Sequence, residues 1–136
     1  MERDWERAIE RGDAEWVRNI LEHTTDERAR HAMINSKDQH GQTGLMVAAV
    51  RGHAAVVRLL LENQAELNHT AKYHLSALLL ATINRHAEIV RRLVDAGADR
   101  EIRGTGAAGF AELTALELAE TSGYEEIAAL LRAPSH

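Results

Sequence analysis

A short glycine-rich run offers the first chemistry that this sequence could perform. Residues 104–109, Gly-Thr-Gly-Ala-Ala-Gly, match the spacing G-x-G-x-x-G, in which backbone N–H groups at the start of a helix can hold a phosphate. That use requires a strand before the run, a helix directly after it and a surrounding βαβ unit. Only residues 101–103 are available for the strand, so we expect an enlarged loop. Binding of a nucleotide or another small ligand by this loop stays an alternative.

The eight histidines are the next candidates, because imidazole is a common metal ligand. The chain has no cysteine and no H-E-x-x-H pattern, so the spacing does not indicate a metal site. His53 and His86 lie 33 residues apart, each at the expected start of a helix, which favours a structural capping role. His69 and His74 fall in one loop, where chelation of an ion is an alternative. We otherwise expect neither a metal nor a cofactor.

The sequence lacks the residues that covalent catalysis would need. Without cysteine there is no thiol nucleophile, and none of the four serines lies in a G-x-S-x-G turn. Ser76 instead precedes an expected helix, where its hydroxyl can accept a hydrogen bond from a free backbone N–H. We therefore expect a protein that is not an enzyme.

Composition and charge exclude several other classes. With 136 residues the chain has room for one domain, and its 45% hydrophobic content is enough for a buried core. Sixteen Lys and Arg against 21 Asp and Glu give a formal charge of −5, so we expect no binding to nucleic acid or to an anionic membrane. The charged start is unlike a signal peptide, and no apolar run is long enough to span a membrane. These features predict a soluble cytoplasmic protein.

An internal repeat organises the whole chain. Residues 43–61 match residues 76–94 at an offset of 33, and residues 114–131 match the second copy at an offset of 38. A further copy near the start matches the first at an offset of 40. Seven extra residues therefore separate the first two units, and five extend the loop before the fourth. We expect one domain, 1–136, with four units at approximately 1–34, 35–67, 68–98 and 99–136.

Within each unit the apolar spacing is helical. Leu45, Ala48 and Ala49 lie at positions i, i+3 and i+4 and form one face of about two turns. Gly52 ends that helix, and a second apolar helix follows it. Because such short helices are unstable alone in water, the pairs must bury their faces on one another. Together with an aromatic content of only 4%, this predicts an all-α stack of helical hairpins.

Hydroxyl residues mark the start of the first helix in three units. Thr43, Ser76 and Thr114 each stand directly before the apolar run, where a side-chain oxygen can cap free N–H groups. Thr114 and Glu117 also have the spacing of a capping box. We expect these three residues to fix where the helices begin.

The second unit carries the pattern of a known repeat family. Its matching positions are Asp38, Gly41, Thr43, Leu45, Ala48, Ala49, Gly52, His53, Val56, Val57, Leu59, Leu60, Leu61 and Ala65. With the period of 33, they make the chain resemble the ankyrin repeat proteins over essentially its whole length. The resemblance implies an all-α solenoid of helix-turn-helix units with finger loops between them, capped by the first and last units.

The departures from the family pattern also carry expectations. Gly44 and Met46 replace the Pro and His of the T-P-L-H signature, so we expect looser helix starts than in consensus repeats. His74 and Arg85 replace turn glycines in the third unit. Since a side chain disfavours the left-handed backbone that such turns need, we expect strain or an altered geometry there.

For function, the resemblance implies a non-catalytic module that binds a protein partner on its concave face, made of first helices and finger loops. The positions carried over are Gln39, His40, Gln42, Val50, Arg51, Lys72, Tyr73, Leu75, Ile83, Asn84, Phe110, Leu113, Thr121 and Ser122. Six of them are apolar where an isolated monomer would be polar, as binding hot spots are: Val50, Tyr73, Leu75, Ile83, Phe110 and Leu113. For Phe110 and Leu113 a second interpretation is that they cover the core of the insertion. We expect a monomer, with self-association through the same surface as an alternative.

Overall fold

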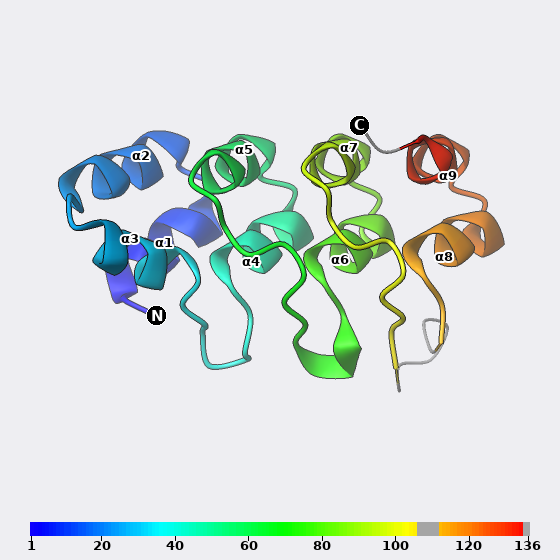
Figure 1. Ribbon diagram of the computed structural model, residues 1–136, viewed down its shortest axis with the longest axis horizontal. Helices are drawn as coiled ribbons and strands as arrows, with labels where there is room; N and C mark the ends of the chain where they lie inside the picture. The colour runs from blue at the N-terminus through cyan, green and yellow to red at the C-terminus, as the bar shows by residue number, and fades with distance from the viewer. Residues whose placement is uncertain (106–111, 135–136) are drawn as a thin grey trace.

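The computed structural model describes residues 1–105 and 112–134, and this part of the chain is all-helical (Figure 1). Its helices are α1 (Arg3–Arg11), α2 (Ala14–His23), α3 (Glu27–Ile34), α4 (Gly44–Arg51), α5 (Ala54–Glu62), the 3-10 turn η1 (Lys72–His74), α6 (Ala77–Ile83), α7 (Ala87–Asp95), α8 (Ala115–Ser122) and α9 (Glu125–Arg132). Extended backbone pairs only locally in the described residues, at an isolated bridge between Lys37 and Thr43. The prediction of an all-α fold is confirmed.

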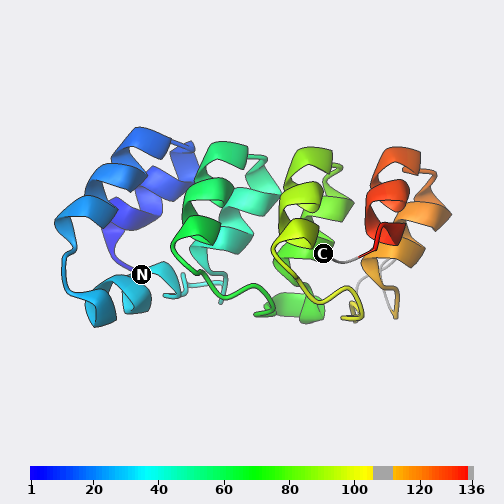
Figure 2. The ribbon, with the colours of Figure 1, turned by 45° about the horizontal axis from the view of Figure 1, so that its top comes forward.

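The helices stand in two rows. Figure 1 shows α1, α4, α6 and α8 in one row and α2, α5, α7 and α9 in the other, with the loops between units extending beyond the first row. Figure 2 shows the same four pairs side by side along the length of the molecule. Helices of neighbouring pairs contact each other within both rows, so the chain forms a continuous stack.

Apolar side chains fill the space between the helix pairs. Trp5 on α1, Leu60 on α5, Leu78 on α6 and Leu93 on α7 are each at most 2% exposed. The helices that carry them have only seven to nine residues, too few to be stable alone. Burial against the neighbouring pair therefore supplies the stability that each pair lacks.

The predicted caps of the first helices are confirmed. Thr43 Oγ1 accepts a hydrogen bond from Met46 N at 3.4 Å, and Ser76 Oγ accepts one from Leu79 N at 3.3 Å. Thr114 forms a complete capping box, in which the Glu117 carboxylate also accepts from the Thr114 N–H. These bonds make the first helices begin at the same repeat position in three successive units.

His53 and His86 do not cap their own helices, which corrects the prediction made for them. Neither makes a side-chain cap bond; instead, His53 Nε2 donates to the Glu10 carbonyl at 2.9 Å, and His86 Nε2 donates to the Val50 carbonyl at 3.1 Å. Each ring thus bonds to the end of the first helix in the preceding unit. The repeated position joins units to one another because the ring reaches across the interface between them.

The ring of His86 lies over a glycine of the preceding unit. Gly52 ends α4 with a left-handed backbone of φ +80°, and a Cβ built on it would lie 2.7 Å from His86 Cε1. Gly12 has the same relation to His53, whose ring also occupies the space of a Cβ. Glycine is therefore required here by its backbone and by the close approach of the ring.

The third unit replaces this glycine and histidine pair by Arg85 and Tyr124. Arg85 adopts φ +61°, and its guanidinium lies 4.8 Å from the centre of the Tyr124 ring, a cation–π contact. The predicted strain in the turns of the third unit is confirmed here, and again at His74, with φ +58°.

The insertion after the first unit folds into α3, a helix that the sequence analysis did not identify. Only Ile34 of this helix is buried. The apolar residues of α3 therefore show too little periodicity to predict a helix from the sequence. Asn35 follows the helix, and its side-chain oxygen accepts from Glu66 N at 2.9 Å. The insertion is thereby fixed to the loop that follows α5.

The contact between Gly52 and His86 can be tested by adding a single methyl group. We expect Gly52→Ala to lower the free energy of unfolding by about 2 to 3 kcal/mol, because it adds left-handed strain and displaces the ring from its hydrogen bond. Gly123→Ala is the matched control: Gly123 has φ +76° at the same turn, but no atom lies within 4 Å of its Cβ position. Urea unfolding should show a loss of only about 1 kcal/mol for this control. Equal losses for the two variants would contradict the role of the ring.

Candidate partner-binding surface

Two histidines join neighbouring finger loops. His69 Nε2 donates to the Gly41 carbonyl at 3.1 Å, and His74 Nδ1 donates to the Arg103 carbonyl at 2.9 Å. Thr105 N also donates to the Tyr73 carbonyl at 2.7 Å. Among the described residues no group of three or more His, Asp, Glu or Cys side chains could hold a metal ion. His69 and His74 therefore connect neighbouring units.

Tyr73 is held in an exposed position in the finger loop of the third unit, before α6. Its side chain is 42% exposed, the highest among the large hydrophobic residues of the described chain. Tyr73 and His74 both have left-handed backbones, at φ +63° and +58°, which cost of order 1 to 3 kcal/mol per residue. The bonds to Arg103 and Thr105 hold the loop in this strained conformation. The chain thus maintains an exposed aromatic side chain at an energetic cost.

A groove lies between α1, α4 and the finger loop of the second unit, which precedes α4. Its volume is about 440 Å³, and its lining residues are Glu6, Glu10, Asp38, Gln39, His40, Gln42, Val47, Val50 and Arg51. The structure therefore brings together all five residues that were predicted as binding positions in the second unit. Asp38 shapes the finger, since its Oδ1 accepts from His40 N at 2.8 Å and from Gln42 N at 3.0 Å.

The positions predicted in the third unit divide between surface and core. Lys72 and Asn84 are exposed, and Ile83 is half-buried. Leu75 is only 8% exposed and belongs to the hydrophobic core, so the expectation of an exposed apolar side chain is wrong for this residue. The reason is the turn around Tyr73, which is closed by a hydrogen bond from Ala71 N to the Leu75 carbonyl at 3.2 Å and directs the chain inward.

The positions predicted in the fourth unit are described in part. Thr121 and Ser122 are exposed at the end of α8, and Leu113 is half-buried. Phe110 lies outside the described residues. Whether Leu113 serves a partner or covers the insertion therefore stays a prediction.

The start of the glycine run is already engaged by backbone partners. Gly104 N donates to the Leu113 carbonyl at 3.1 Å, and Thr105 N donates to the Tyr73 carbonyl. The next described helix, α8, begins only at Ala115, and its first turn is capped by Thr114. The described part of the run therefore has no free N–H group for a phosphate, and residues 106–109 lie outside the description.

An ion pair joins the two sides of the glycine run in the fourth unit. Arg103 Nη1 donates to Glu117 Oε1 at 2.7 Å and to the Glu112 carbonyl at 2.6 Å. The hydrogen bond from the Thr114 N–H has the largest effect on the pKa of Glu117, and it lowers this pKa. Partial loss of hydration raises the pKa by less, and the charge of Arg103 lowers it further, so the pKa lies below its ordinary value of 4.5. The negative charge of Glu117 is thus balanced by an arginine of its own unit.

Comparison with known proteins identifies the repeat. A family model described as ankyrin repeats, in three copies, matches residues 6–104. The chain belongs to the ankyrin repeat family. Ankyrin repeats are generally protein–protein interaction modules without catalytic activity. No curated protein matches the chain. None of the helices in the described ranges is both long and apolar enough to cross a membrane.

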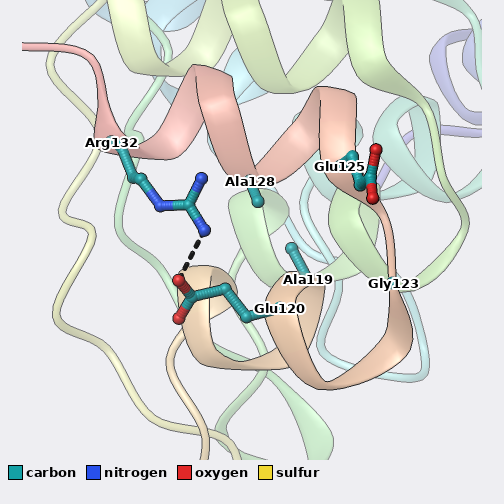
Figure 3. Close-up of a pocket in the computed structure, with 6 residues that line it drawn as sticks. All are labelled: Ala119, Glu120, Gly123, Glu125, Ala128 and Arg132. Carbon is teal, nitrogen blue, oxygen red and sulfur yellow. Dashed lines mark hydrogen bonds and ion pairs between the residues drawn. The ribbon is translucent and has the colours of Figure 1, made fainter.

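The outer face of the last ankyrin unit carries another hollow, shown in Figure 3. Its lining includes Glu120 and Arg132, which form an ion pair of 2.6 Å between α8 and α9. At the repeat positions of these two residues, the third unit has Thr82 and Val94, which are 0% and 8% exposed. The hollow therefore marks the face where a further unit would stack, made polar by two charged residues.

The low pKa of Glu117 makes a testable contribution to stability. Since the folded state lowers this pKa, the contribution is present above about pH 4.5 and is lost as the pH falls through the folded-state value. We expect Glu117→Gln to unfold more easily than wild type at pH 7, and the difference to shrink in acid. NMR titration of the Glu117 carboxyl should give a pKa below 4.5, which rises in Arg103→Ala. A value at or above 4.5 in the wild type would refute this assignment.

Proposed function

We propose that this protein is a non-catalytic module that binds one protein partner along its first helices and finger loops. We name this surface the binding strip and define it by Val50, Tyr73, Ile83 and the groove beside α1. The observation that supports it most is Tyr73, a strained and exposed aromatic side chain held by bonds to the next finger. Strain of this kind is found at ligand-binding sites, where the surrounding structure maintains it.

The stack supports binding because it fixes the strip before a partner arrives. Val50 and Ile83 occupy the same repeat position in adjacent units, and both are half-buried. The His86 bond to the Val50 carbonyl fixes one unit against the other. A surface already held in one conformation loses little entropy on binding, which leaves more of the contact energy as affinity.

The proposal can be tested by affinity capture from a lysate of the source organism, followed by measurement of Kd with the purified partner. We expect Tyr73→Ala/Ile83→Ala to weaken binding by about 30-fold or more, as the loss of a hot spot of about 2 kcal/mol does. Arg58→Ala/Arg91→Ala is the matched control, because both arginines are exposed on the second row of helices. Circular dichroism verifies that all variants are folded.

Two results would contradict the proposal. In one, a partner binds the wild type and the strip variant with equal affinity. In the other, the control on the second row loses binding while the strip variant keeps it, which would move the interface to α5 and α7.

A further inference from the structure

The lining of the groove beside α1 combines apolar side chains with carboxylates. Val47 and Val50 come from α4, and Glu6 and Glu10 come from α1, one turn apart on the same face of the helix. All four side chains are buried or half-buried. A volume of about 440 Å³ is large enough for a long side chain together with a neighbouring residue.

The charges of the groove are unbalanced. Its lining carries three carboxylates, those of Glu6, Glu10 and Asp38, against the single guanidinium of Arg51. Within the described chain, neither Glu6 nor Glu10 forms an ion pair, whereas Glu117 and Glu120 at the other end are paired with arginines. Carboxylates that are partly shielded from water and unpaired interact more strongly with an added cation than exposed ones do.

From this groove we infer the chemistry of the partner, an inference that rests on the proposed function. We propose that the groove receives a lysine or arginine side chain from a partner segment that also carries aliphatic residues. The aliphatic stem lies on Val47 and Val50, its charged end meets Glu6 and Glu10, and the aliphatic neighbours continue along the strip toward Ile83. Long basic side chains suit such a site, because their stem is apolar and only the end is charged.

A metal ion fits the groove less well than a basic side chain. No set of three or more acidic or histidine side chains in the described ranges converges closely enough to bind a metal. Asp38 also uses one carboxylate oxygen, Oδ1, to hold the finger loop. Two separate carboxylates together with apolar side chains in one groove match a guanidinium or ammonium group on a flexible stem.

The test uses a random peptide library of about 12 residues displayed on phage, selected on the full-length protein. We expect enriched peptides to contain Lys or Arg close to Leu, Ile, Val or Met. Synthetic copies should bind Glu6→Gln/Glu10→Gln at least about tenfold more weakly than wild type, and added salt should weaken their binding to the wild type. Glu125→Gln/Glu126→Gln, two exposed carboxylates on α9, form the matched control and should leave Kd unchanged.

The inference and the proposed function fail in different ways. Enriched peptides without a basic residue, or peptides that bind Glu6→Gln/Glu10→Gln as well as wild type, would overturn the inference. If the same peptides failed to bind the Tyr73→Ala/Ile83→Ala variant, the proposal of the binding strip would still be supported. Peptides that bind independently of both double variants would overturn the strip as well.

Charge reversal provides a second measurement that does not depend on loss of binding alone. We expect Glu10→Lys to reject the selected basic peptide and to regain affinity for a copy in which the basic residue is changed to glutamate. Failure of this reversal in a folded Glu10→Lys variant would also overturn the inference.

Discussion

The whole structure depends on burial between neighbouring helix pairs. No helix in the described chain exceeds ten residues, so local hydrogen bonds cannot stabilise any pair alone. The apolar faces of α4 and α6, and of α5 and α7, are completed only by each other and by the flanking units. The shape of the surface therefore depends on folding of the whole stack, because residues of different units keep their relative positions only while the stack is intact.

Hydrogen bonds between units fix how each unit is aligned with the next. His53 and His86 fix the ends of the first helices, while His69 and His74 fix the fingers. Each ring donates to a backbone carbonyl of an adjacent unit, so a shift of one unit against the next would break bonds as well as contacts. This arrangement explains how a chain with a small, mostly aliphatic core can hold a tyrosine in a strained, exposed conformation.

Much of the fold could be predicted from the sequence, because the repeat period and the caps at Thr43, Ser76 and Thr114 are local signals. Contacts between units could not be predicted in the same way. The burial of Leu75, the cross-unit bonds of the histidines and the half-buried carboxylates of Glu6 and Glu10 all depend on which element faces which. Helix α3 was missed because a helix with one buried residue leaves almost no apolar pattern.

Equilibrium unfolding of a chain that ends at residue 98 tests the dependence on neighbouring units most directly. Removal of residues 99–136 takes away α8 and α9, which cover α6 and α7, and exposes apolar side chains such as Val90 and Leu93. We predict that the shortened protein unfolds at a much lower urea concentration than the full chain, or aggregates. A cooperative transition at an unchanged midpoint would contradict the claim that each unit depends on burial against the next.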